Sequence, residues 1–188
     1  MKTFSISILF FICLNVNYGQ LLTDRFVHEI VALDSDEKKE AFLLNINELD
    51  QKVRLEKNDC EQKAHGSLQC AELRLKMGET DLENLVKIAM YLRLYDYPSK
   101  TSFTEKAVST PWLVLHHSVG SVPNWDKEFS PYLVKAWKNQ DINTTNLHWY
   151  LKRYYSAYMG APYVRDTTTN EEEDIVDLIK LLKLNDIK

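Results

Sequence analysis

The sequence predicts an all-α fold: a compact irregular bundle of seven or eight helices, forming one domain after a cleaved signal peptide. Apolar residues recur at intervals of three and four along most of the chain, which is typical of amphipathic helices. Cap-type residues stand immediately before several of these stretches. Strand signals are sparse, and no Asn-Gly or Asp-Gly pair separates two alternating apolar runs.

The first 19 residues are expected to be a secretory signal peptide. Ile6–Leu14 is apolar but too short to cross a bilayer, and Gly19 offers a small residue at a cleavage point. A lipoprotein anchor at Cys13 is the alternative. We therefore expect a secreted or periplasmic protein, with residues 20–188 as a single helical domain and no membrane span in the mature chain.

The first part of the mature chain is expected to hold two helices and a loop. The first helix covers Leu21–Leu33, and the second begins at an Asp34 cap. The second helix carries an apolar seam along one side, made of Phe42, Ile46, Leu49 and Val53. Asn58–Gly78 contains two glycines, and we expect it to be a loop with a short helix around Ala71–Lys76.

Cys60 and Cys70 are the only cysteines left once the signal peptide is removed. An even pair in an exported protein indicates a disulfide, which here would staple the expected loop. Two reduced structural cysteines are the alternative. A metal site needs more ligands than this pair supplies, although His65 lies between the two cysteines.

Thr80-Asp81-Leu82-Glu83 has the form of a capping box and predicts a helix that runs to about Tyr95. The buried positions of this helix are expected to be Leu82, Leu85, Ala89 and Leu92. Pro98 prevents continuation of the helix, because it disfavours helical backbone at the preceding residue.

The stretch from Thr110 to Ser118 is apolar, ends on two adjacent histidines, and is expected to be the centre of the fold. Ser102 is expected to open the helix that leads into it. Thr110 and Pro111 can be the cap and first residue of a separate helix, because proline suits that position. The alternative is one kinked helix over residues 103–118, and the sequence does not separate the two.

Three more helix starts are expected in the last third of the chain. Ser130-Pro131 is a cap followed by proline and predicts a helix over Tyr132–Gln140. Asn143 or Thr144 caps the next helix, which Gly160 terminates. The last helix starts near Asn170, and its buried stripe is expected to be Ile175, Leu178, Ile179 and Leu182.

The composition excludes several classes of function. A net charge of −4 gives no basic footprint, so no nucleic-acid partner is expected. The sequence has no glycine loop for phosphates, no nucleophile elbow and no cluster with metal-ligand spacing. We therefore expect no cofactor and no metal.

A few polar residues at the edges of the apolar stripes are candidates for a site. Asp50 and Arg54 lie four residues apart on one helix face, where they can pair with each other or orient a ligand. Adjacent helical residues point about 100 degrees apart, so His116 and His117 are expected to face different surroundings. Arg153 lies among aromatic residues and can stack, pair with Asp50 or bind an anion.

Four blocks of the chain resemble an uncharacterised bacterial domain family of unknown function that is often found in exported proteins. The blocks are Asp50-Gln51-x-x-Arg54, similar to D-Q-x-x-R; Tyr97-Pro98, similar to Gly-aromatic-Pro; Trp112 to Ser118, similar to W-x-x-x-Q-H-[SA]-D; and Leu151 to Arg153, similar to L-x-D-R. The resemblance spans about residues 40–165. Asp96 replaces the family's glycine, His116 its glutamine, and Val119 and Lys152 two of its acids.

Carried over by position, the resemblance implies a functional or structural cluster of Asp50, Gln51, Arg54, His117 and Arg153. The family brings no established reaction. We expect a binding module that holds a small ligand or a partner in a cleft between the central segment and the Asn143–Tyr158 helix, with His116 as a further candidate. The alternatives are a hydrolase with His117 as general base and a protein that interacts with an envelope partner.

Overall fold

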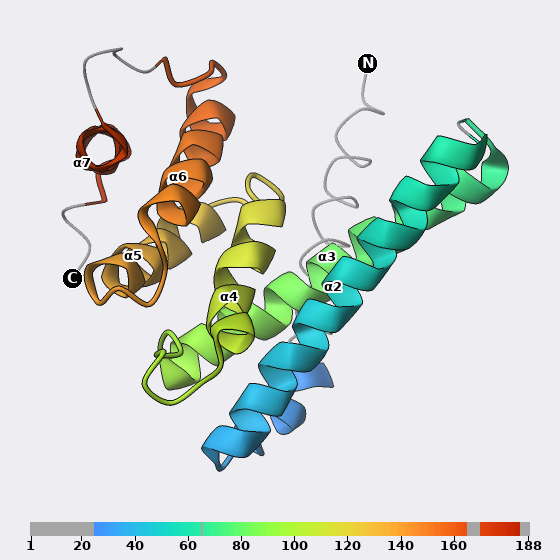
Figure 1. Cartoon of the computed structure of the whole chain (residues 1–188), viewed down its shortest axis with the longest axis horizontal. Helices are drawn as coiled ribbons and strands as arrows, with labels where there is room; N and C mark the ends of the chain where they lie inside the picture. The colour runs from blue at the N-terminus through green and yellow to red at the C-terminus, as the bar shows by residue number, and fades with distance from the viewer. Residues whose placement is uncertain (1–24, 65, 165–169, 185–188) are drawn as a thin grey trace, which may run out of the picture.

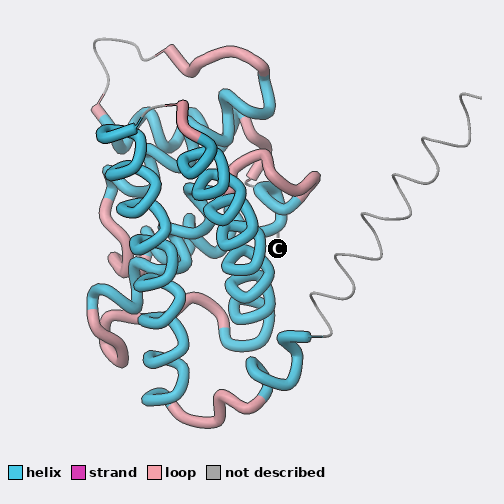
Figure 2. Tube along the Cα trace, turned by 90° about the vertical axis from the view of Figure 1, so that its right-hand side faces the viewer, coloured by secondary structure: helices cyan, strands magenta, loops and turns pink. Residues whose placement is uncertain are grey.

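The computed structural model describes residues 25–64, 66–164 and 170–184. These residues form helices joined by turns and loops, with no strand among them (Figure 2). A helical segment at 25–31 precedes six longer helices: α2 (Asp36–Ala64), α3 (Leu68–Tyr95), α4 (Glu105–His117), α5 (Trp125–Lys138), α6 (Thr144–Met159) and α7 (Glu171–Leu181). The predicted all-α fold is confirmed. The predicted signal peptide lies outside the described residues.

None of the described helices is both long and apolar enough to cross a lipid bilayer.

The start of α2 differs slightly from the prediction, because Asp34 is not its cap. Ser35 takes this place, and its hydroxyl accepts a hydrogen bond from the Lys38 amide at 3.4 Å.

α2 and α3 form a long antiparallel hairpin (Figure 1). Gly66, which lies between the two helices, has a φ of 80°, a left-handed conformation that glycine adopts without steric cost. Two ion pairs link the helices, one between Glu61 and Arg74 at 2.8 Å and one between Glu56 and Lys76 at 3.1 Å. The hairpin is therefore fastened along its length beyond the turn itself.

The predicted loop over Asn58–Gly78 is wrong, because α2 continues to Ala64 and α3 begins at Leu68. Gly78 lies inside α3, where glycine costs only about 1 kcal/mol relative to alanine. Burial of one apolar face over the length of the helix outweighs that cost. The predicted capping box at Thr80 is also wrong, since the Thr80 hydroxyl donates to the Lys76 carbonyl at 2.9 Å within the continuous helix.

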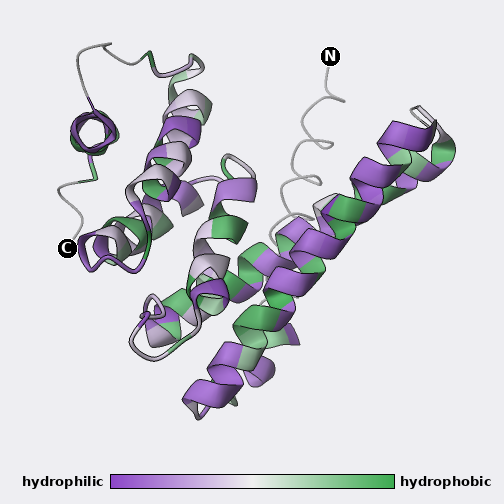
Figure 3. Ribbon diagram, in the orientation of Figure 1, coloured by the Kyte–Doolittle hydropathy of each residue, from purple (hydrophilic) through white to green (hydrophobic). Residues whose placement is uncertain are grey.

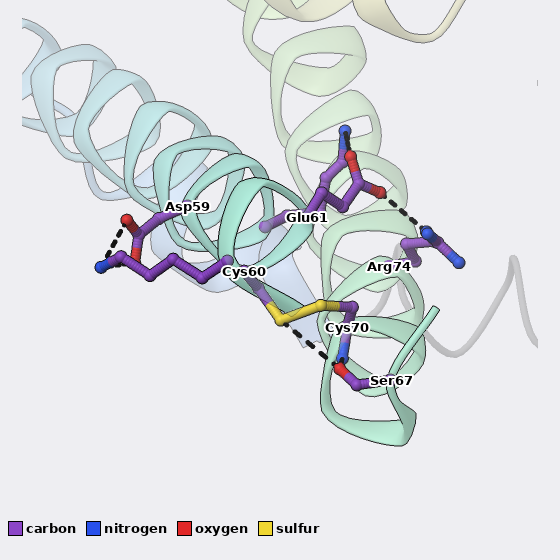
Figure 4. The surroundings of a disulfide bond; sticks show 8 residues. Asp59, Cys60, Glu61, Ser67, Cys70 and Arg74 are labelled. Carbon is purple, nitrogen blue, oxygen red and sulfur yellow. Dashed lines mark hydrogen bonds and ion pairs between the residues drawn. A yellow bond between two sulfur atoms is a disulfide. The ribbon is translucent and has the colours of Figure 1, made fainter. Parts of the chain in front are cut away.

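The predicted disulfide between Cys60 and Cys70 is present at the tip of the hairpin (Figure 4). It joins the last turns of α2 to the first turn of α3, with 5.6 Å between the two Cα atoms. The first turn of α3 is also capped by Ser67, whose hydroxyl accepts a hydrogen bond from the Cys70 amide at 3.2 Å. The staple therefore closes a helical hairpin instead of the loop that the sequence suggested.

α4 lies against the hairpin on one side and against α5 and α6 on the other (Figure 1). It is one helix with Pro111 inside it, so Thr110 and Pro111 do not start a separate helix. Thr110 is buried, and its hydroxyl accepts a hydrogen bond from the Asn47 amide at 3.3 Å. The helix begins after Thr104, whose amide donates to the Glu40 carboxylate at 2.8 Å, and not after Ser102.

The predicted start of α5 at Ser130-Pro131 is wrong, because the helix already begins at Trp125. The Ser130 hydroxyl bonds to the Asp126 carbonyl inside the helix and caps nothing. The predicted limits of α6 are confirmed: Asn143 caps the helix and Gly160 follows it with a φ of 69°. Asn170 and Glu173 form a capping box at α7.

Buried apolar residues from all seven described helices form one continuous cluster. Its largest fully buried side chains include Tyr91, Phe129, Tyr150 and Ile175. Figure 3 shows hydrophobic and hydrophilic residues alternating along α2 and α3, as expected for helices that bury one face. The predicted stripe of α7 belongs to the same core, which places α7 against α6.

We expect Gly78→Ala to raise the free energy of unfolding by about 1 kcal/mol, because alanine is the better helix former. A Cβ atom at Gly78 would meet nothing within 4 Å. Urea denaturation measures the change. Gly66→Ala is the matched control: its Cβ also meets nothing, but its φ of +80° makes alanine strained, so this variant should be less stable. A destabilising Gly78→Ala would contradict the continuity of α3.

Candidate functional site

Side chains from four helices meet near the C-terminal end of α4. They are Asp50 and Arg54 of α2, Asp81 of α3, His117 of α4 and Arg153 of α6, here named the His117 cluster. The hairpin supplies one wall of the cluster and α6 the other. Asp50 and Arg54 share a face of α2 because they lie four residues apart.

Asp50 is the buried centre of the cluster, with 1% of its surface exposed. One carboxylate oxygen lies 3.1 Å from His117 Nδ1, and the Arg54 guanidinium donates to both oxygens at 3.1 and 3.2 Å. The exposed Gln51 amide donates to the second oxygen at 2.8 Å. Burial raises the pKa of Asp50, but the hydrogen bonds and charges of His117 and Arg54 outweigh it, so the pKa lies below its ordinary value. Asp50 is therefore ionised at neutral pH.

Arg54 also binds a carboxylate on the neighbouring helix. Its Nη2 atom lies 2.5 Å from an oxygen of Asp81. Burial raises the pKa of Asp81 above its ordinary value, although the Arg54 charge acts in the opposite direction and the Asp50 charge adds to the rise. The guanidinium is thus held between two carboxylates, and its positive charge is already neutralised within the cluster.

His117 presents one ring nitrogen to Asp50 and leaves the other available. Nδ1 faces the carboxylate, whereas Nε2 makes no hydrogen bond to any residue in the described part of the chain. The side chain keeps 19% of its surface exposed. An Asp50 carboxylate that accepts the Nδ1 proton leaves Nε2 as a base when the ring is neutral and as a donor when it is protonated.

His116 has different surroundings, as expected for adjacent helical residues. Its ring stacks on Trp112, with 5.3 Å between the ring centroids. Burial lowers the pKa of His116 to about 4, and the nearby positive charges of Arg153, His117 and Arg54 contribute. His116 is therefore neutral at pH 7. Its Nδ1 atom is buried without a hydrogen-bond partner in the described structure.

Arg153 is the exposed member of the His117 cluster. Its guanidinium donates to the His117 carbonyl oxygen at 3.5 Å, and it forms no ion pair with a carboxylate of the described residues. Its charge also acts on Asp126. Burial raises the pKa of Asp126 above its ordinary value, although a hydrogen bond from the Gly120 amide and the charge of Arg153 act in the opposite direction. Arg153 is thus a cation beside His117 with donors to spare.

The structure brings together five of the six candidate residues of the sequence: Asp50, Gln51, Arg54, His117 and Arg153. His116 lies next to them but stacks on Trp112 instead. The structure adds Asp81, which the sequence suggested only as part of a capping box. The local sequence held no signal for this role, because Asp81 reaches Arg54 only through the register of the hairpin.

The sequence interpretation also missed His148, which is 4% exposed between α6 and α7. Its Nε2 atom lies 3.3 Å from Asp174 and its Nδ1 atom 3.5 Å from Glu171. This buried histidine lies between α6 and two carboxylates of α7 and is separate from the His117 cluster.

Comparison with known proteins gives no matching family model, no similar curated sequence and no similar solved structure. Within the described residues, no group of three or more His, Cys, Asp or Glu side chains is arranged to hold a metal ion.

We expect His116→Gln to flatten the pH dependence of stability between pH 6.5 and 4. In this window the unfolded chain binds a proton that the folded His116 does not, so acidification lowers the free energy of unfolding. The contribution is fully present above pH 6.5 and lost by about pH 4. It amounts to at most about 3 kcal/mol, because solvent screens the partly exposed ring.

Urea denaturation at a series of pH values measures this effect. His28→Gln is the matched control, because His28 is exposed and should leave the pH profile of the wild type unchanged. An unchanged profile in His116→Gln would show that His116 is not held neutral by its surroundings.

Proposed function

We propose that this protein is a secreted or periplasmic binding module, and that its His117 cluster binds a small anionic ligand, a carboxylate or a phosphate. The observation that carries the proposal is the contrast between the two arginines. Arg54 is held by two carboxylates, whereas Arg153 is exposed beside His117 and forms no ion pair with a carboxylate of the described residues. A guanidinium presents several donors in a plane, which suits an anion with two oxygens.

The charges of the cluster favour an anion when His117 is protonated. The two arginines balance Asp50 and Asp81, so protonation of His117 leaves one positive charge. Asp50 stabilises that charge at Nδ1 and holds the ring so that the Nε2 proton points away from the carboxylate. An anion that accepts this proton replaces the missing negative partner of Arg153. Binding should therefore be stronger at low ionic strength.

The site is also largely organised before a ligand arrives. Asp50 is buried and accepts hydrogen bonds from Arg54 and Gln51 in addition to its contact with His117. These contacts limit rotation of the imidazole, so little side-chain freedom remains to be lost on binding. The mobile group is the exposed Arg153, which can turn towards an anion at small cost.

Isothermal titration with inorganic phosphate and with acetate, at pH 6 and at low salt, tests this function. We expect saturable binding of one of these anions by the wild type and a loss of at least about tenfold in affinity in Arg153→Ala. Arg153 is exposed, so the variant should fold normally. Lys152→Ala removes the neighbouring cation of the same helix and should bind as the wild type does. Equal affinity in Arg153→Ala and the wild type would overturn the proposal, as would the absence of saturable binding of both anions.

A hydrolase is the second candidate, because His117 Nδ1 lies 3.1 Å from the buried Asp50 carboxylate. A carboxylate in this position orients a histidine and stabilises the cation that forms when Nε2 takes a proton, which is the arrangement of a general base. Arg153 beside it would hold a developing negative charge.

We expect a pH–rate profile on a panel of carboxylic and phosphoric esters to show an inflection that His117→Gln abolishes. A loss of about 100-fold or more in kcat, with little change in KM, would indicate general-base catalysis. Phosphate binding without turnover of any ester in the panel would support the binding module and contradict the hydrolase.

A further inference from the structure

A concave surface lies between α5 and α7 and shares no residue with the His117 cluster. It is a groove of about 640 Å³. Its floor is apolar and is made by Val134 and Trp137 of α5 together with Ile179 and Leu184 from the end of the described chain. The volume lies within the range of small-molecule sites, roughly 300–1000 Å³.

The charged residues of this groove all have the same sign. Lys135, Lys138 and Lys180 line it, and no Asp or Glu does, although the chain as a whole has a net charge of −4. Lys135 is paired with Asp96. Lys138 and Lys180 form no ion pair with the described residues, and they come from opposite walls of the groove. The groove therefore combines an apolar floor with an uncompensated positive rim.

We propose that this groove binds an anionic amphiphile with a single acyl chain, of the fatty-acid class. The acyl chain lies on the apolar floor between α5 and α7, and its carboxylate meets Lys138 and Lys180. The charge complementarity selects the anionic head group, and the apolar floor selects the chain. Lysine suits this arrangement, because its methylene stem can cover apolar surface while its ammonium group remains in water.

Another groove, at the end of α3 and beside α5, differs from this one in its balance of charges. That groove has a larger volume, about 800 Å³, but Arg93 and Lys135 face Glu128 and Asp96 within it. Arg93 pairs with Glu128 at 2.7 Å, and Lys135 pairs with Asp96. Its charges are compensated, so it offers no preference for an anion.

Titration with dodecanoate below its micelle concentration, followed by calorimetry and by tryptophan fluorescence, tests the proposal. Trp137 lines the groove, and Trp137→Phe should remove the fluorescence change while calorimetric binding persists. Octanoate is four methylenes shorter and should bind roughly 250-fold more weakly, because each buried methylene contributes a factor of roughly four. A cationic amphiphile with the same dodecyl chain should bind much more weakly than dodecanoate.

The double variant Lys138→Glu/Lys180→Glu should reduce the affinity for dodecanoate by at least about tenfold. Lys106→Glu/Lys127→Glu is the matched control, since it makes the same change of charge at exposed positions outside the groove and should bind as the wild type does. Equal binding of both amphiphiles, unchanged affinity in the groove variant, or binding to anionic vesicles without binding of monomeric dodecanoate would overturn the proposal. Loss of phosphate binding in Arg153→Ala leaves this test unaffected.

Discussion

The burial of one ionised carboxylate, Asp50, constrains much of the arrangement around the site. A buried charge without partners is expensive, and removal of one partner from a buried pair typically costs about 3–5 kcal/mol. Asp50 obtains its partners from two different helices, Arg54 on its own helix and His117 at the end of α4. α4 must therefore cross the hairpin at one level and in one orientation, which also fixes where the chain turns back toward α6.

The His117 cluster has a closed half and an open half, and only the open half is available to a ligand. Asp50, Arg54 and Asp81 satisfy one another between α2 and α3, so this half serves the architecture. His117 belongs to both halves, because its Nδ1 atom contacts the buried Asp50 carboxylate and its Nε2 atom is left without a hydrogen bond to the described residues. Arg153 completes the open half from α6. The structural and the functional interpretation of these residues are thus compatible, because they concern different atoms of the same cluster.

Much of this organisation could be predicted from the sequence, and the errors have a common cause. Apolar periodicity correctly indicated an all-helical chain, and the caps at Asn143 and Asn170 correctly marked helix starts. The interpretation failed where a local cap signal lay inside a helix, at Thr80 and at Ser130, because burial over many residues outweighs one cap. It also missed Asp81, whose partner is set by the register of two helices and not by neighbours in sequence.

The distribution of cations separates a structural part of the chain from a part suited to ligands. In the hairpin most lysines and arginines already form ion pairs with carboxylates. Two of these pairs join α2 to α3: Arg74 with Glu61, and Lys76 with Glu56. In the helices after α4 the described structure leaves Arg153, Lys138 and Lys180 without ion pairs. An exposed unpaired cation costs little free energy by itself. Beside an outward-facing imidazole or on the rim of an apolar groove, however, it supplies attraction that only an anion can use. Both proposed ligands are anionic for this reason, and both would bind to the part of the fold whose charges the architecture does not already use.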